Sequence, residues 1–255
     1  MKKAIIYTLA FLVVQLIAST TVRGIDMLFE GKQTVMTTGM QIIAMVLQTL
    51  ITVMLFCGLR WAEPTRSYLL SHPWDVFFWC VIAAFGSIVP SMFLQEQMPE
   101  LPNVVEQQLS DIMSHRGGYF VICLLAPVAE ELVFRGAVLR ALLAWKPQRA
   151  WGMIAISAVL FSLAHLNPAQ MPHAFIMGLL LGWLYWRTGS IAPGIAFHWA
   201  NNTVAYLLFR AYPDPSLRLI NILGGQQRSV AAAIAFSLLI LLPALYQLHV
   251  RMKRV

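Results

Sequence analysis

Long apolar stretches separated by short polar connections repeat along almost the whole sequence. Crossing a bilayer as a helix takes about 20 residues, and eight of the stretches approach or exceed that length. They cover residues 4–22, 37–59, 75–94, 118–145, 150–166, 171–186, 191–212 and 229–250. Lipid offers no partner to an unpaired backbone N–H or C=O, so such segments fold as helices. The pattern predicts an all-α, polytopic membrane helix bundle with about eight transmembrane helices.

Composition supports this fold class. The chain has 255 residues, of which 59% are hydrophobic and 11% are charged, whereas a soluble domain carries about 25% charged residues. Because the apolar excess is spread over the whole chain, we expect a single integral membrane domain covering residues 1–255, with a functional core at about 118–212. The net charge of +7 fits Lys and Arg residues that flank spans and meet anionic lipid. We therefore expect the lipid bilayer as a partner and no nucleic acid.

An even number of spans places both termini on the same side of the membrane. Counted by side for eight spans, 11 Lys and Arg residues lie on the side of the termini and 6 on the other, with Arg135 inside a span. Cytoplasmic loops carry the excess of these residues, so both termini should be cytoplasmic. The short loops suit a bacterial inner (plasma) membrane protein. The first apolar run could be a signal peptide, but its length favours a retained helix.

Two adjacent glutamates, Glu130 and Glu131, lie in the middle of the stretch 118–145. A carboxylate at membrane depth is costly and usually has a function or a partner. Arg135 follows Glu131 by four residues, a spacing that permits an ion pair on one helix face. Glu130 is turned about 100° away, because a helix has about 3.6 residues per turn. We interpret Glu131 and Arg135 as a support and Glu130 as the reactive group. The alternative is that both glutamates only pair with Arg135.

Two histidines add candidate chemistry on other spans. His165 follows Phe161 by four residues, and Asn202 follows His198 by four, so each pair shares a helix face. Alone, each polar group would more commonly bond a neighbouring helix. Together, Glu130 and His165 could hold and deprotonate a water molecule, while His198 and Asn202 could stabilise an oxyanion. We assign no role to Asn201, on another face, or to His173, expected at the membrane interface.

A metal would be an alternative way to activate the water. Glu130, His165 and His198 have the ligand types of a catalytic Zn²⁺ site, although the H-E-x-x-H signature is absent. Helical rise creates one difficulty for a single site. His165 lies about 24 Å along its helix and His198 only about 12 Å along its own, at 1.5 Å per residue. The two rings must reach the same depth for the site to exist.

The three motifs in this order resemble those of the CPBP intramembrane proteases, the family of CAAX proteases and bacteriocin-processing proteins also called Abi, which includes the Ras-converting CAAX endopeptidase. The motifs are Glu130-Glu131-x-x-x-Arg135, Phe161-x-x-x-His165 and His198-x-x-x-Asn202. The resemblance implies that Glu130 activates water, that His165 assists or binds metal, and that His198 and Asn202 hold the oxyanion. Glu131, Arg135 and Phe161 match supporting positions.

The function implied by the resemblance is a metallo- or glutamate-type intramembrane endopeptidase. Its substrate would be a membrane-anchored or lipidated peptide, including a prenylated CAAX-type peptide. One alternative is a non-catalytic membrane protein of the bacteriocin-immunity or chaperone type that binds a peptide. Another is an ion or proton transporter that uses Glu130 and the histidines as a relay.

Overall fold

The computed structural model describes residues 1–29, 36–63, 66–214 and 217–252, and this part of the chain is helical without strands, as predicted. The long helices are α1 (Lys2–Phe29), α2 (Thr38–Gly58), α4 (Trp74–Glu96), α8 (Ala150–Ala164), α9 (Met171–Thr188), α10 (Ala192–Ala211) and α12 (Gln227–Arg251). The short helices are α3 (Arg66–Leu70), α5 (Glu106–Ser114), α7 (Arg140–Trp145) and α11 (Leu219–Ile222), and a 3-10 turn, η3, spans Pro147–Arg149.

The segment with the two glutamates is one continuous helical run of alternating type. A π-helical segment, η1 (Phe120–Leu125), leads into α6 (Ala126–Glu131), and a second, η2 (Leu132–Leu139), leads into α7. Pro127 has no N–H to give to the carbonyl four residues before it, which weakens regular α-helical bonding there. Consistent with this, the N–H of Ala126 donates to the carbonyl of Val121, five residues back. Single π turns inside helices occur frequently at functional sites.

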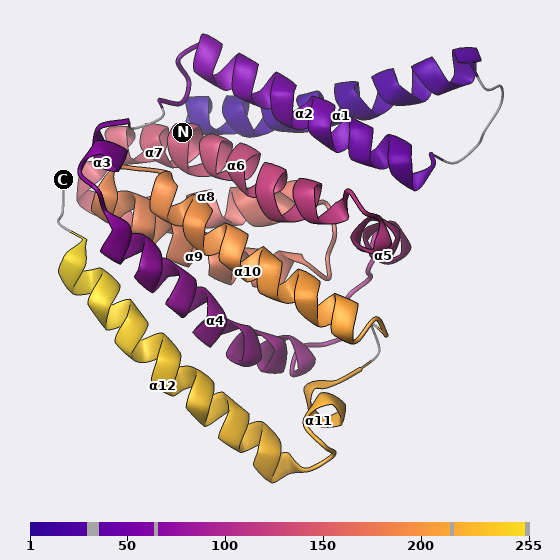
Figure 1. Cartoon of the computed structure of the whole chain (residues 1–255). Coiled ribbons are helices and arrows are strands. Elements are labelled where there is room, and N and C mark those ends of the chain that lie inside the picture. The colour runs from indigo at the N-terminus through magenta and orange to yellow at the C-terminus, as the bar shows by residue number, and fades with distance from the viewer. Residues whose placement is uncertain (30–35, 64–65, 215–216, 253–255) are drawn as a thin grey trace.

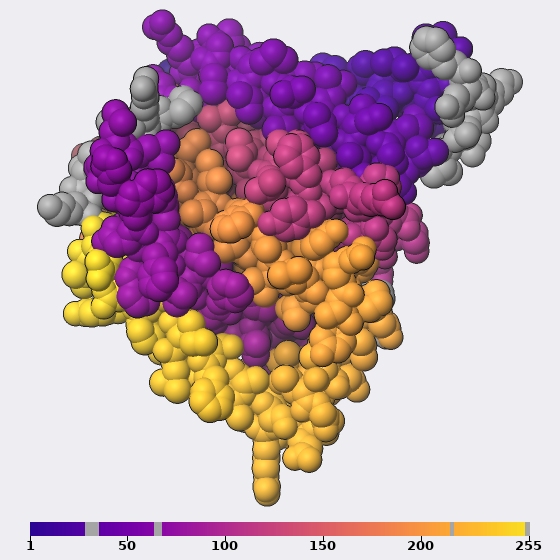
Figure 2. All heavy atoms as spheres, in the orientation of Figure 1, coloured from indigo at the N-terminus to yellow at the C-terminus, as the bar shows by residue number. Residues whose placement is uncertain are grey.

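The helices lie side by side in one bundle (Figure 1). The pair α1 and α2 crosses one side, and α6, α10, α4 and α12 follow in that order across the bundle, with α8 and α9 packed together behind them. In the space-filling view α2 lies against the 115–145 region, with α10 beside it (Figure 2). The site helices α6, α8, α9 and α10 therefore lie between the α1–α2 pair and the α4–α12 pair.

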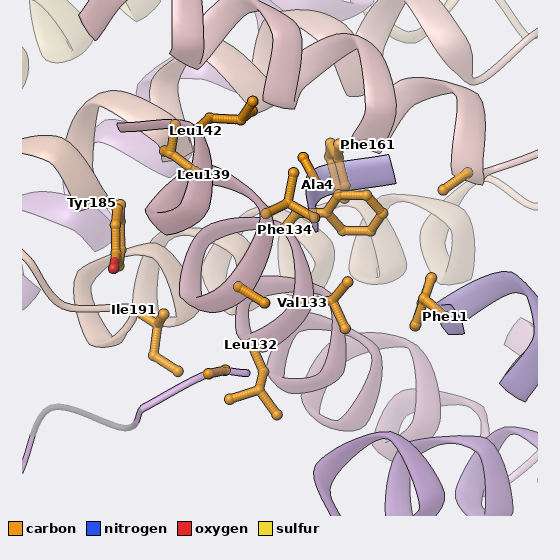
Figure 3. Close-up of a cluster of buried hydrophobic side chains, with 14 of the residues drawn as sticks. Ala4, Phe11, Leu132, Val133, Phe134, Leu139, Leu142, Phe161, Tyr185 and Ile191 are labelled. Carbon is orange, nitrogen blue, oxygen red and sulfur yellow. The ribbon is translucent and has the colours of Figure 1, made fainter. Parts of the chain in front are cut away.

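Two clusters of buried apolar side chains hold the bundle together. The first joins α1, η2 and α8, with Phe11, Phe134 and Phe161 among its members (Figure 3). The second joins α4, α9, α10 and α12, with Leu181 and Phe197 among its fully buried members. Helix α9 contributes to both clusters, since Ala174 belongs to the first and Met177 and Leu181 to the second.

Among the described residues, four helices have the length and apolar composition of a membrane span, so the prediction of about eight is not confirmed. They are α1 (counted over Lys2–Leu28), α2, α4 and α12. Helix α8 has only 15 residues, and the run 120–145 is divided into short α and π segments. Helices α9 and α10 contain His173, His198, Asn201 and Asn202, whose polar side chains lower the mean hydropathy. Among the helices that carry the candidate site, α8 is thus too short for a span, and α9 and α10 carry polar side chains.

Two connections between the helices have a defined structure. Helix α9 ends at Thr188, and Gly189 makes the turn that follows with φ 64°, a left-handed conformation that glycine adopts without strain. The polar stretch between residues 95 and 116 contains α5, which buries Ile112 and Met113.

Candidate active site

The site is built around a fully buried ion pair in the 120–145 run. Glu131 Oε1 lies 2.8 Å from Arg135 Nη1, and both side chains are 0% exposed. The pair predicted from the i, i+4 spacing is therefore present. A buried carboxylate needs such a partner, because an unpaired charge in a low-dielectric interior is very costly.

Arg135 also ties three helices together. Its Nη2 donates to the carbonyl of Gly178 in α9 at 3.3 Å. Its guanidinium carbon lies 4.4 Å from the centroid of the Phe161 ring in α8, within the range of a cation–π interaction. Arg135 thus connects Glu131 to α8, which His165 directly follows, and to α9.

Glu131 is held closely from the side of α10. The backbone of Gly194 approaches so near that a Cβ there would lie 2.6 Å from Glu131 Oε2. Glu131 Oε2 has no hydrogen-bond partner in the described part of the chain, whereas Glu131 Oε1 is well supplied with donors. The absence of a side chain at Gly194 is what lets α10 and α6 meet at this point.

His198 lies between the two glutamates. Its Nδ1 is 3.2 Å from Glu131 Oε1, and its Nε2 is 3.8 Å from Glu130 Oε2. Because a carboxylate only accepts hydrogen bonds, Nδ1 donates to Glu131. This bond orients the imidazole so that Nε2 points to Glu130. Glu131 therefore bonds both Arg135 and His198, while Glu130, with 20% of its side chain exposed, approaches His198 instead of joining the Arg135 pair.

Phe161 brings the two histidine rings together. Its ring centroid lies 4.8 Å from that of His165 and 6.1 Å from that of His198, with edge-on geometry in both cases. His165 directly follows α8, and its Nδ1 lies 2.9 Å from the carbonyl oxygen of Phe161. The two rings therefore lie on either side of one phenyl ring, close enough to line the same cavity, although counting residues along each helix placed them apart. The short α8 ends within the bundle, so its end meets the middle of the other helices.

All four residues to which we assign catalysis line one cavity of about 320 Å³. They are Glu130, His165, His198 and Asn202. Helices α2, α5 and α9 contribute apolar walls, including Met45, Leu109 and Met177. Asn202 also fixes the position of its helix, because its Nδ2 donates to the carbonyl of Ile122 in η1 at 3.1 Å. One N–H of that amide is used there, and the other is available to a ligand.

Two further residues in this cavity escaped the sequence reasoning. His173 lines the cavity and its Nδ1 lies 2.7 Å from Ser91 Oγ in α4, whereas its place at the membrane interface stays a prediction. Asn201 also lines the cavity, is 4% exposed, and has a buried Oδ1 without a partner in the described ranges. The sequence did contain a signal for Asn201. It follows His198 by three residues, and residues three apart in a helix also share a face.

The candidate Zn²⁺ ligands Glu130, His165 and His198 lie around one cavity. Within residues 1–29, 36–63, 66–214 and 217–252, no group of three or more His, Cys, Asp or Glu side chains is placed to hold a metal ion. Glu130, His165 and His198 share a cavity but do not form such a group. The requirement for a metal therefore stays a prediction, and the reaction proposed below uses only these side chains and water.

Comparison with known families supports the assignment made from the motifs. Residues 115–204 match the family model described as Type II CAAX prenyl endopeptidase Rce1-like. The matched segment contains all seven residues of the three motifs, and it confirms the resemblance predicted from them. It covers less than half of the chain and leaves out α1, α2, α4 and α12. Comparisons with curated proteins and with solved structures gave no match.

Proposed function

Since residues 115–204 are similar to CAAX prenyl endopeptidases and the chain is an integral membrane protein, we propose that it is an intramembrane endopeptidase. It hydrolyses a peptide bond in a membrane-anchored or lipidated peptide. The observation that carries the proposal is that Glu130, His165, His198 and Asn202, from α6, the end of α8 and α10, line one cavity. The comparison favours a protease over a non-catalytic peptide-binding protein.

In the proposed reaction, Glu130 and His165 hold a water molecule in the cavity. The water oxygen attacks the carbonyl carbon of the scissile bond while Glu130 takes one proton, as a general base does. The C–N bond of the resulting tetrahedral intermediate then breaks, and the proton on Glu130 passes to the leaving amine nitrogen. One water is consumed, and a new carboxylic acid and a new amine are formed. The acid then gives its remaining proton to the amine or to solvent and becomes a carboxylate. The reaction needs no redox partner or other co-reactant.

The negative charge that develops on the carbonyl oxygen is stabilised from α10. The remaining N–H of Asn202 and the Nε2 of His198 are the donors available for it. Since His198 Nδ1 donates to Glu131, Nε2 donates only when the ring carries both protons. In that form two cations, Arg135 and His198, stand against the carboxylates of Glu130 and Glu131. The local charge is then balanced before substrate arrives, which lowers the cost of burying these groups.

The substrate class follows from the surroundings of the cavity. Its apolar walls and its place among membrane helices suit a peptide held near the bilayer by a lipid or by its own membrane helix. A prenylated CAAX-type peptide is the form suggested by the family. We propose this class of substrate. A test must distinguish recognition of the lipid from recognition of the peptide sequence.

The test uses the purified full chain in lipid vesicles with three peptides: a farnesylated CAAX-type peptide, the same peptide without the lipid, and a single-span membrane peptide. Cleavage in water enriched in heavy oxygen should place one heavy oxygen on the new carboxylate, as detected by mass spectrometry. We expect Glu130→Ala or His165→Ala to lower the rate about 10²–10⁴-fold, the usual range for a lost general base. The protein should still accumulate in the membrane.

A matched control is Glu106→Ala in α5, which removes an exposed glutamate and should leave the rate unchanged. Full activity of a stably accumulating Glu130→Ala protein would contradict the proposal. A chelator arm addresses the metal. An unchanged rate in chelator fits water activation without a metal. A loss of activity that Zn²⁺ restores would contradict the metal-free step proposed above.

A further inference from the structure

A second cavity adjoins the first and shares part of its wall. It has a volume of about 190 Å³ and lies between α1 and the α6–α8 region. Glu130, Phe161 and His165 line both cavities, and α1 contributes Phe11 and Gln15 to the smaller one. The proposed base and its partner histidine can therefore be approached from two directions.

The roles of the site residues divide between the two cavities. His198 and Asn202, the proposed oxyanion donors, line the larger cavity and are not among the residues that line the smaller one. The peptide carbonyl must therefore lie in the larger cavity. Glu130 and His165, which handle the water, reach both. A peptide that fills the larger cavity would close that approach to water, while the smaller cavity would stay open behind Glu130.

The smaller cavity has the properties needed to hold water. A water molecule needs about 10–15 Å³ of such space and two to four polar partners, and the cavity far exceeds this volume. Gln15, Glu130 and His165 supply the polar groups. Gln15 is a carboxamide near the middle of the apolar helix α1, where polar groups are costly and usually have a function.

Packing of α1 on the bundle holds Gln15 in this position. Phe11, one helical turn before Gln15, meets Phe134 edge-on with ring centroids 5.6 Å apart, and Phe134 in turn meets Phe161 at 5.2 Å. The three rings lie in the first apolar cluster (Figure 3). Phe11 and Gln15 share a helix face because they are four residues apart. The aromatic contacts therefore direct Gln15 toward the Glu130 side of the bundle.

We propose that the smaller cavity supplies water to Glu130 and that Gln15 is a positioning residue in it. This inference rests on the proposed endopeptidase function. It gives α1, which lies outside the matched segment 115–204, a part in the reaction. Water enters the cavity beside α1, is held by Gln15 and His165, and reaches Glu130 while the peptide occupies the larger cavity.

Cysteine labelling tests whether this cavity is wet, without relying on cleavage. A charged methanethiosulfonate reacts with a thiolate, which forms in water and not in lipid. In vesicles, Gln15→Cys should react, whereas Leu16→Cys, on a residue that is 63% exposed on the outer face of α1, should not. Ser71→Cys, at an exposed turn between α3 and α4, is the positive control. The wild-type protein, with its native Cys57, Cys80 and Cys123, is the blank.

Each outcome decides the question. Reaction of Gln15→Cys but not of Leu16→Cys supports a water-filled cavity. No reaction of Gln15→Cys while Ser71→Cys reacts would overturn it, and so would equal reaction of Gln15→Cys and Leu16→Cys. If the wild-type protein cleaves no peptide, the proposed function fails, but the labelling result still stands for the cavity.

Kinetics test the part played by Gln15. Gln15→Leu should lower kcat about tenfold, the effect of losing roughly one hydrogen bond in the transition state, and leave KM unchanged because the peptide lies elsewhere. Gln15→Asn keeps a carboxamide and should recover part of the rate. Gln48→Leu makes the same chemical change in α2 and should have no effect on kcat. A rise in KM without a fall in kcat for Gln15→Leu, or no change at all, would refute this role.

Discussion

At the residue scale, Glu131 Oε1 accepts hydrogen bonds from both Arg135 and His198. The neighbouring carboxylate, Glu130, is partly exposed and lies in the wall of both cavities. One carboxylate therefore fixes the positions of a guanidinium and an imidazole, and the other is free to meet a ligand. Because Glu130 and Glu131 occupy different faces of the helix, a substitution near one carboxylate should leave the contacts of the other unchanged.

Gly194→Ala should disturb the Glu131 carboxylate specifically. The new Cβ would lie 2.6 Å from Glu131 Oε2, and the carboxylate cannot move without lengthening its bonds to Arg135 and His198. We expect cleavage to be largely lost and the protein to be destabilised by about 1–3 kcal/mol, as overpacking typically does. Activity and thermal unfolding in detergent measure the two effects. Gly152→Ala in α8, with nothing within 4 Å, is the control, and equal behaviour of the two variants would contradict this account.

Sequence reasoning named the residues that share the cavity, but it did not show how separate helices bring them together. The spacing of Glu131 and Arg135 was enough to predict their ion pair, because both lie on one helix. The meeting of His165 and His198 at Phe161 depends on where α8 ends inside the bundle, which residue counting along separate helices placed at different depths. His173 was missed because its partner, Ser91, lies on a distant helix.

At the element scale, close contact between α8 and α9 sets the position of His165. Gly178 and Gly182 in α9 are four residues apart, and a Cβ at either would lie 2.8 Å from an atom of α8, on Ala158 and Ile154 respectively. Small residues at such spacing let membrane helices approach closely. The carbonyl of Gly178 also accepts from Arg135, so this contact links the helix pair to the ion pair.

Gly178→Ala should separate α8 from α9. Its Cβ would lie 2.9 Å from the Cα of Ala158, a backbone atom that cannot turn aside as a side chain can. We expect a lower melting temperature together with a loss of cleavage, because Arg135 bonds Gly178 in α9 and contacts the Phe161 ring in α8, and it cannot keep both contacts when the helices separate. Gly24→Ala in α1, with nothing within 4 Å, should at most raise stability slightly, since Ala favours helix. A fully active, equally stable Gly178→Ala protein would show that this contact does not position the site.

Hydropathy predicted where helices lie more reliably than whether they are α-helical or π-helical. The stretches 37–59, 75–94 and 229–250 correspond closely to α2, α4 and α12. The pattern treated 118–145 as one regular span, whereas the structure alternates α and π turns around Glu130 and Glu131. Hydropathy reads the polarity of residues and not the hydrogen-bond register, so the effect of Pro127 on the helix type was not visible in it.

At the scale of the whole molecule, the beginning of α1 and the end of α12 lie at the same end of the bundle (Figure 1). We therefore expect both termini on one side of the membrane, and the distribution of Lys and Arg predicts the cytoplasmic side. Reporter fusions at each terminus, one active only in the cytoplasm and one only outside it, measure this. Opposite readings at the two ends would contradict the arrangement.

The most direct test of the account compares Glu130→Gln with Glu131→Gln, two substitutions of the same size at adjacent positions. Cleavage of a membrane-anchored peptide and the thermal unfolding of each purified protein in vesicles are measured together. Glu130→Gln should lower the cleavage rate about 10²–10⁴-fold at an unchanged melting temperature. Glu131→Gln should lower the melting temperature, because it leaves Arg135 buried without its counter-charge. A Glu130→Gln protein that cleaves at the wild-type rate would contradict the account.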